Sequence, residues 1–249
     1  MKTIIWTSIV LLNLSFCVNP PKKVEKKETT SMQGEWEVLF DGSSTDHWHL
    51  FNGEGMSKDW HIENDALVFR PVEGHPQQNI VTHKEYTNFE LSLEWKISEK
   101  GNSGIFYGVV ESDAYNEPYL TGPEIQVLDN EGHPDAQTNP KYHQAGALYD
   151  MVQPSVDVCK PAGEWNHVLL IVNHKTNTAS VQLNGTEIVR YEPHGENWDA
   201  MVMASKFGNK EAYNYLEAPD FGKFQKGKIG LQDHDDVVSY RDIKIREIQ

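Results

Sequence analysis

Hydrophobic and polar residues alternate along many short stretches of the chain from about residue 36 onward. The clearest case is 89–97, where one face collects the apolar residues Phe89, Leu91, Leu93, Trp95 and Ile97. An alternation with a period of two residues is typical of a strand that buries one face. Similar patterns predict strands within 36–40, 60–62, 66–69, 105–110, 121–130, 165–172, 179–183, 187–190, 228–232 and 237–248.

Turn signals separate these stretches and connect some of them as hairpins. Asn184-Gly185 lies between 179–183 and 187–190, and an Asn-Gly pair in that position is among the strongest hairpin signals. Only the short segments 198–204 and 210–216 suggest helices. Short strands at regular spacing with aromatic-rich faces predict an all-β fold, a sandwich of two curved antiparallel sheets.

The stretch 121–130 carries the most suggestive chemistry. Ile125 and Val127 alternate with Glu124 and Gln126, so one face of this predicted strand offers a carboxylate beside an amide. Such a pair on a rigid strand suits the binding of a polyol or the transfer of a proton. The alternative is an ordinary polar pair that faces solvent.

The N-terminal segment has the features of an export signal. Lys2 precedes an apolar run over 4–14, which is the plan of a secretory signal and is too short for a membrane span of roughly 20 residues. Cys17 follows a segment that resembles the lipobox of bacterial lipoproteins, in which the cysteine is acylated after cleavage. A signal that is simply cleaved is the alternative.

These features predict three parts: a signal over 1–17 with lipidation at Cys17, a flexible tether over 18–33, and one β-sandwich domain over 34–249. The tether is rich in lysine, proline and threonine and has almost nothing to bury. We expect an exported protein, a periplasmic or outer-membrane lipoprotein. Any contact with a membrane is expected only through the N-terminal lipid anchor.

Charge and cysteine content exclude several classes of protein. The formal net charge of −15 argues against nucleic acid as a partner. Once Cys17 is acylated or removed, Cys159 has no intramolecular partner, so no disulfide framework is expected. The chain has no glycine-rich phosphate loop and no nucleophile elbow, so no nucleotide cofactor is expected either.

A cluster of one histidine and three aspartates raises the alternative of a metal site. The sequence Asp233-His234-Asp235-Asp236 has groups that can bind a divalent cation, but it lacks the spacing of a recognised metal loop. We therefore predict no metal and leave a bound divalent cation open. The other histidines of the loops and strand ends form no ligand pair at helical spacing and are expected at the surface; they are His133, His143, His167, His174 and His194.

Eight short motifs, in order along the chain from about residue 36 to the C-terminus, carry a resemblance to a known family. They are Phe40-Asp41-Gly42, Phe89-Glu90-Leu91 with Glu94-Trp95-Lys96, Gly101-Asn102-Ser103-Gly104-Ile105, Gly122-Pro123-Glu124-Ile125-Gln126 with Leu128-Asp129, Ala145-Gly146-Ala147-Leu148-Tyr149-Asp150, Lys160-Pro161 with Gly163-Glu164-Trp165-Asn166, Ser205-Lys206-Phe207, and Gly230-Leu231-Gln232-Asp233-His234. Together they resemble the 3-keto-disaccharide hydrolase family. The resemblance implies a concanavalin-like jelly roll with its site on the concave face, and activity on glycosides already oxidised at C3 by a separate oxidoreductase.

The polar residues near Glu124 also indicate which route of glycosidic bond cleavage is chemically possible. A glycosidase needs two carboxylates that flank the bond, but the neighbour of Glu124 on its own face is Gln126, and Asp129 has the opposite parity. A 3-keto sugar needs only a general base for the C2 proton, a donor to the enolate oxygen and an acid for the leaving group. Glu124 and His234 are the candidate acid and base, in an order that the sequence leaves open, and Lys206 is the candidate for stabilising the enolate.

Further polar residues suit sugar hydroxyls, and an aromatic residue could stack on the sugar ring. The predicted substrate-binding residues are Asn102, Tyr107, Gln126, Asp150 and Gln232, with Tyr149 as an alternative to Tyr107. Asn102 between glycines could instead adopt left-handed backbone, and Asp150 could be a turn residue. The predicted partner is a carbohydrate substrate, and the rival functions are a lectin-like binding module and an ordinary glycoside hydrolase.

Overall fold

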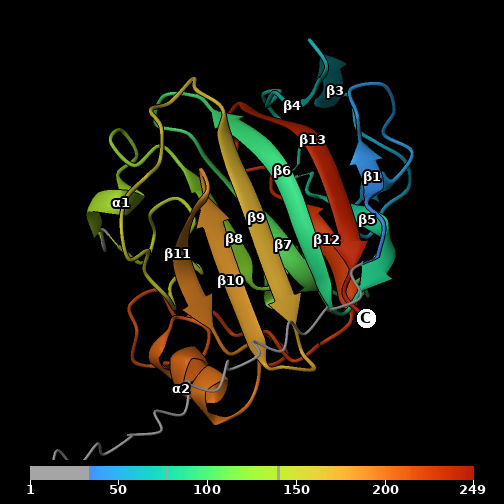
Figure 1. Ribbon diagram of the computed structural model, residues 1–249. Helices are drawn as coiled ribbons and strands as arrows, with labels where there is room; N and C mark the ends of the chain where they lie inside the picture. Colours follow the sequence, from blue (N-terminus) through green and yellow to red (C-terminus); the bar gives the residue numbers. More distant parts are fainter. Residues whose placement is uncertain (1–33, 77, 139–140) are drawn as a thin grey trace, which may run out of the picture. The chain divides into compact units, whose positions relative to one another are not determined.

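The computed structural model describes residues 34–249 except 77 and 139–140, so the predicted signal, Cys17 and tether lie outside the described residues. The strands of the described part form two antiparallel sheets (Figure 1). The larger sheet contains β1 (Glu37–Phe40), β3 (Trp60–Glu63), β4 (Ala66–Phe69), β6 (Phe89–Ile97), β9 (Asn166–Asn173), β10 (Thr178–Leu183), β11 (Thr186–Tyr191) and β13 (Val238–Glu247). The smaller sheet contains β2 (Trp48–Leu50), β5 (Ile80–Tyr86), β7 (Asn102–Val109), β8 (Glu124–Leu128) and β12 (Gly227–Leu231).

The order of the strands confirms the predicted sandwich. In the larger sheet the order is β11-β10-β9-β6-β13-β4-β3, with β1 also paired to β13, and in the smaller sheet it is β2-β5-β12-β7-β8. Every pair is antiparallel. Most neighbours are far apart in sequence, as the crossing connections of a jelly roll require.

The alternation of β6 places its apolar face in the core between the sheets. Leu91, Leu93 and Trp95 are inaccessible to solvent, and β6 lies between β13 and β9 in the middle of the larger sheet. Ile105 of β7 and Ile125 of β8 belong to the same core from the smaller sheet. Burying each such side chain contributes about 1.5–3 kcal/mol, so this layer fixes the position of the smaller sheet and of the polar residues on its other face.

The predicted hairpin and one predicted helix are confirmed. Asn184 and Gly185 both have positive φ, 51° and 81°, as the two central residues of a tight hairpin turn between β10 and β11 require. Helix α2 (Glu196–Ala204) contains the predicted 198–204. The helix predicted over 210–216 is wrong: the segment forms successive turns, and it is then tied to Lys206 by a hydrogen bond from the Leu216 N–H.

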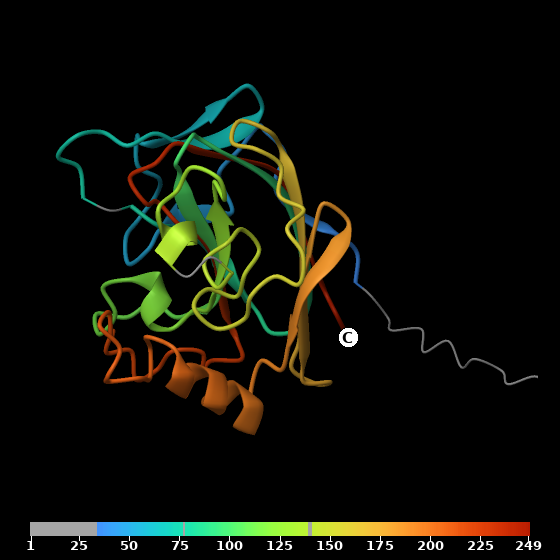
Figure 2. The same cartoon turned by 90° about the vertical axis from the view of Figure 1, so that its left-hand side faces the viewer.

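Two strands and two short helical turns escaped the sequence pattern. In β5, three consecutive polar and exposed residues, His83, Lys84 and Glu85, interrupt the alternation, and β2 is only three residues long. The 3-10 turn η1 (Pro118–Leu120) and the short helix α1 (Asp135–Thr138) lie in loops. Figure 2 shows both on the side of the smaller sheet that faces away from the larger one.

The helices of the described part are all short. None of them, within residues 34–249, is long and apolar enough to cross a membrane.

Candidate active site

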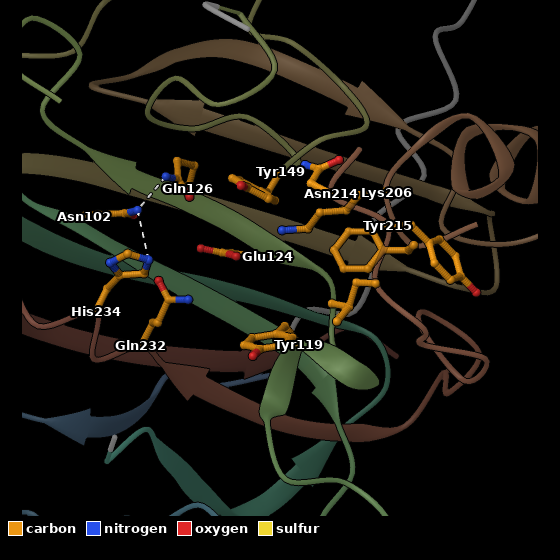
Figure 3. Close-up of a pocket in the computed structure, with 12 residues that line it drawn as sticks. Asn102, Tyr119, Glu124, Gln126, Tyr149, Lys206, Asn214, Tyr215, Gln232 and His234 are labelled. Carbon is orange, nitrogen blue, oxygen red and sulfur yellow. Dashed lines mark hydrogen bonds between the residues drawn. The ribbon is translucent and has the colours of Figure 1, made fainter. Parts of the chain in front are cut away.

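A pocket of about 310 Å³ lies on the face of the smaller sheet that points away from the core (Figure 3). This volume is within the range of small-molecule sites. Strands β7 and β8 and the segment just after β12 supply its floor, and η1 and the loops after β8 and α2 supply its walls. Its lining residues are Asn102, Tyr119, Glu124, Gln126, Tyr149, Lys206, Phe207, Asn214, Tyr215, Leu216, Gln232 and His234.

Strand β8 places a carboxylate and an amide in this pocket, as predicted. Glu124 and Gln126 face the pocket, while Ile125 and Val127 are fully buried in the core. Although β8 is the last strand of its sheet, the segment 145–149 covers its free edge. The Gln126 N–H donates to the Ala147 carbonyl at 3.0 Å, and the Tyr149 N–H donates to the Glu124 carbonyl at 3.0 Å. The strand is therefore held from both sides, which makes it a rigid support for the two side chains.

The Glu124 carboxylate is buried and lies over the backbone of Gly104. Glu124 is 7% exposed, and a Cβ added at Gly104 would collide with its carboxyl group. Burial raises the pKa of Glu124 to about 8; the Lys206 charge lowers this pKa in part, and the Asp135 charge raises it further. Among the described residues, burial and neighbouring charges set this pKa, and no hydrogen bond contributes to it. Glu124 is consequently protonated for the most part at neutral pH and can act as an acid.

Two amides connect β8 to His234. Gln126 Nε2 donates to Asn102 Oδ1 at 3.0 Å, and Asn102 Nδ2 lies 3.4 Å from His234 Nε2 (Figure 3). When Gln126 donates in this way, Asn102 presents an N–H to the imidazole, whose Nε2 then accepts. Asn102 belongs to β7 and does not have the left-handed backbone that was its alternative explanation. The structure thus brings three of the predicted site residues together.

Two buried amide oxygens in the pocket lack partners. Gln126 Oε1 and Gln232 Oε1 form no hydrogen bond with any residue that the structure describes, and the two residues are 1% and 8% exposed. A buried acceptor without a partner is unfavourable by about 1–3 kcal/mol, so such groups usually have a ligand or water. Both oxygens line the pocket, where a sugar hydroxyl could donate to them.

Lys206 enters the pocket from the loop that follows α2. Its Nζ lies 4.4 Å from the centre of the Tyr149 ring, and Figure 3 shows the ammonium pointing towards Glu124. A cation over an aromatic face is stabilised by the ring quadrupole. The loop itself is fixed, because the Lys206 N–H donates to Asp150 Oδ2 at 2.6 Å. In the same view Glu124 lies between His234 and Lys206.

The predictions for Asp150 and His143 are wrong. Asp150 does not line the pocket: one carboxylate oxygen accepts from the Lys206 backbone and the other lies 3.1 Å from His143 Nε2, while its φ of 59° marks a turn. His143 was expected at the surface, but its side chain is only 4% exposed. Hydrophobic periodicity carries no information about a buried histidine in a polar loop, so only the three-dimensional contacts reveal it.

The prediction for Tyr107 is also wrong. Its side chain points into the core, where its hydroxyl accepts a hydrogen bond from the Tyr191 hydroxyl at 2.8 Å. The signal that could have placed it is parity: on β7, Tyr107 falls on the same face as Ile105 and on the opposite face from Asn102. Tyr149, the alternative, does line the pocket.

Five of the pocket residues were not predicted. They come from η1 and from loops, where no alternation shows which way a side chain points; they are Tyr119, Phe207, Asn214, Tyr215 and Leu216. The only sequence signal near them is the motif that contains Lys206 and Phe207.

The acidic residues around His234 support the loop rather than converge on one point. Asp233 Oδ2 accepts from the backbone of Gln78, and Asp236 Oδ2 accepts from the N–H of Asn102 at 3.0 Å. Among the residues that the structure describes, no group of three or more His, Cys, Asp or Glu side chains is placed to hold a metal ion.

The chemistry of the pocket follows from these groups. Of the described residues that line it, Glu124 is the only carboxylic acid, and it is joined by one imidazole, one ammonium and several amides. Retaining and inverting glycosidases use two carboxyl groups that flank the bond, whereas the described lining residues include one. The fold and the pocket define a jelly-roll protein of the lectin and glucanase type with a small polar site suited to a polyol.

Comparison with known proteins narrows this class to one family. A family described as "3-keto-alpha-glucoside-1,2-lyase-like domain" matches residues 35–246. The chain belongs to this family, which confirms the resemblance seen in the sequence motifs.

Individual relatives agree with this assignment. A protein of Bacteroides thetaiotaomicron named 3-keto-disaccharide hydrolase is 34% identical over 227 residues, a match that covers 84% of this chain and 77% of that protein. A crystal structure from Parabacteroides distasonis, described as a "putative glycosyl hydrolase", is 30% identical and has a TM-score of 0.74; the match covers 87% of this chain and 94% of that chain. A second structure from the same organism, at 24% identity and a TM-score of 0.65, covers 86% of this chain and 100% of its own and supports the fold.

Proposed function

We propose that the protein cleaves 3-keto-glycosides by removing the proton on C2 and expelling the substituent on C1. The observation that carries this proposal is that Glu124 is the one carboxylic acid among the described residues of the pocket, where it is buried beside an imidazole, an ammonium, amides and tyrosines. The substrate's own ketone supplies what a second carboxylate supplies in a glycosidase, since it makes the C2 proton acidic. The family membership and the name of the Bacteroides relative support the substrate class.

The proposed reaction has three balanced steps. His234 removes the C2 proton, and the electron pair of that bond forms the C2–C3 double bond of an enolate, whose negative O3 is stabilised by the Lys206 ammonium. When the ketone re-forms, the electrons move to a C1–C2 double bond, the C1–O bond breaks and Glu124 protonates the leaving oxygen. Water then adds to the C1–C2 double bond: its hydroxyl bonds to C1 while Glu124 takes the proton that the water gives up, and His234 returns its proton to C2. Both groups are then restored, and the net result is hydrolysis.

The pKa of Glu124 supports its assignment as the acid. A pKa of about 8 keeps the group protonated at neutral pH, and an acid with a pKa near the working pH transfers its proton efficiently. Activity should therefore fall as the pH rises through about 8. The neutral imidazole of His234 can take a proton on its one unprotonated nitrogen. Asn102 Nδ2 lies 3.4 Å from Nε2, so this long contact must give way when Nε2 takes the C2 proton.

The class of function can be tested with one pair of substrates. We expect turnover of methyl 3-keto-glucoside and none of methyl glucoside. Binding of the 3-keto sugar without turnover would instead identify a lectin-like module. Release of methanol from the unoxidised glycoside would identify an ordinary glycoside hydrolase.

The roles of the two groups can be separated with a better leaving group. Glu124→Gln should lower kcat/KM for the methyl glycoside by about 10²–10⁴-fold, because the acid is lost. The same variant should recover with a 4-nitrophenyl 3-keto-glucoside, whose leaving group needs no proton. His234→Ala should be impaired with both substrates. If the 4-nitrophenyl substrate restored the activity of His234→Ala and not that of Glu124→Gln, His234 would be the acid and Glu124 the base.

A further inference from the structure

A buried charged cluster lies behind the wall of the pocket that carries Lys206. His143 Nδ1 is 2.9 Å from Asp135 Oδ1, and His143 Nε2 is 3.1 Å from Asp150 Oδ1. Because both ring nitrogens face carboxylate oxygens, both must carry a proton to make both hydrogen bonds, and the imidazole is then a cation. None of these three residues lines the pocket, so the proposed reaction does not use them directly.

The cluster is connected to Lys206 by two routes. Asp150 uses its second oxygen, Oδ2, to accept the backbone N–H of Lys206 at 2.6 Å. The His143 ring stacks on the Tyr149 ring, with centroids 4.5 Å apart and planes 14° apart, and the Lys206 ammonium lies over the same Tyr149 ring. His143 therefore contacts both groups that hold Lys206, one at its backbone and one at its side chain.

We propose that His143 is a positioning residue, which, held between Asp135 and Asp150, fixes the Lys206 loop and so sets the Lys206 ammonium opposite Glu124. This inference rests on the proposed function, in which that ammonium stabilises the enolate. Groups from five parts of the chain face the cluster: His133 from the loop before α1, Asp135 from α1, Tyr149 and Asp150 from the segment after β8, Lys206 from the loop after α2, and the Glu124 carboxyl group from β8. Without the imidazolium, two carboxylates would face each other across the gap and Asp150 would lose the contact that orients it.

The ionisation of His143 agrees with this geometry. Burial alone would lower its pKa, but the hydrogen bonds to Asp135 and Asp150 outweigh that effect and raise the pKa to about 9. The cation therefore persists at neutral pH. In the protein without substrate, ¹⁵N NMR should show both ring nitrogens of His143 protonated at pH 7. A neutral imidazole at that pH would overturn the proposal, whatever the enzyme does.

The functional test is a double-mutant cycle of His143→Gln and Lys206→Gln. If His143 acts through Lys206, His143→Gln should move the Lys206 ammonium. A misplacement of about 1 Å lowers kcat by about 10²-fold, so we expect a loss of that size on methyl 3-keto-glucoside and a smaller change in KM. In the Lys206→Gln background the same substitution should have almost no further effect. Equal losses in both backgrounds would show that His143 acts on the fold in general.

Controls separate positioning from folding and from the proposed function. His174→Gln removes another half-buried histidine, which lies outside the pocket, and it should leave kcat unchanged. If His143→Gln does not fold, Asp135→Asn takes its place, since the Asp135 side chain is 25% exposed. NMR signals of the Lys206 amide and ammonium should shift in His143→Gln and not in His174→Gln. Because these signals need no substrate, unshifted Lys206 signals overturn the positioning role, whereas an inactive wild type overturns only the proposed function.

Discussion

The Gly104→Ala substitution tests whether the placement of Glu124 matters for activity. A Cβ at Gly104 would stand 2.7 Å from Glu124 Cδ and 2.8 Å from Glu124 Cγ, and the Glu124 side chain accounts for all three nearest atoms. Gly104 does not have positive φ, so alanine suits its backbone. The Glu124 side chain is therefore the group that must move, by about 1 Å or by a change of rotamer.

This displacement should affect activity far more than stability. A misplacement of about 1 Å of a catalytic group lowers the rate by about 10²-fold. An off-rotamer side chain costs about 0.5–1.5 kcal/mol, and at about 2–4 °C per kcal/mol the Tm should fall by no more than about 6 °C. The measurements are kcat/KM on methyl 3-keto-glucoside and thermal unfolding followed by circular dichroism.

A neighbouring glycine provides the matched control. At Gly230 of β12 a Cβ would meet Phe106 at 3.2 Å and would not touch the pocket. Gly230→Ala should lower the Tm and leave kcat/KM close to that of the wild type. Wild-type activity of Gly104→Ala, or equal losses of activity in the two variants, would refute the role given to the Glu124 position.

Three further predictions concern stability and pH. The pKa of Glu124 rises from 4.5 to about 8 on folding, so its contribution to stability is present below pH 4.5 and is lost as the pH rises through 8. Glu124→Gln should thus be more stable than wild type by about 3 kcal/mol at pH 7 and equal to it near pH 4, in urea titrations; a constant difference would contradict this. The kcat/KM profile should fall on its alkaline side near pH 8, where Glu124 loses its proton. In His143→Gln this fall should move to higher pH, because the His143 charge lowers the Glu124 pKa. If the fall does not move, it belongs to a group other than Glu124. Tyr107→Phe should lower the free energy of unfolding by about 1 kcal/mol, through the lost hydrogen bond with Tyr191, and keep full activity; a raised KM would return Tyr107 to the site.

Sequence alone predicts the framework of this protein because strand periodicity and turn chemistry are local properties. The alternation in β6 and β8 placed Trp95 and Ile125 in the core and Glu124 in the site, and Asn184-Gly185 fixed a hairpin. Where a strand exposes consecutive polar residues, as β5 does, the local pattern disappears although tertiary pairing still forms the strand.

The rest of the site depends on loops that meet only in three dimensions. Tyr119, Tyr149 and Lys206 reach one pocket from η1, from the segment after β8 and from the loop after α2. Nothing in the sequence relates these loops, and nothing in it shows that His143 lies between two carboxylates. The two errors in the predicted site have different causes: Tyr107 could have been placed by strand parity, whereas Asp150 could not.

Proton exchange at C2 tests the central claim most directly. The wild type and Glu124→Gln are incubated with methyl 3-keto-glucoside in D₂O, and the sugar is examined by NMR. Deuterium should enter at C2 in the wild-type product, and Glu124→Gln should still exchange the C2 proton of the substrate while cleaving it slowly. Cleavage by the wild type with the C2 proton fully retained would contradict the enolate route.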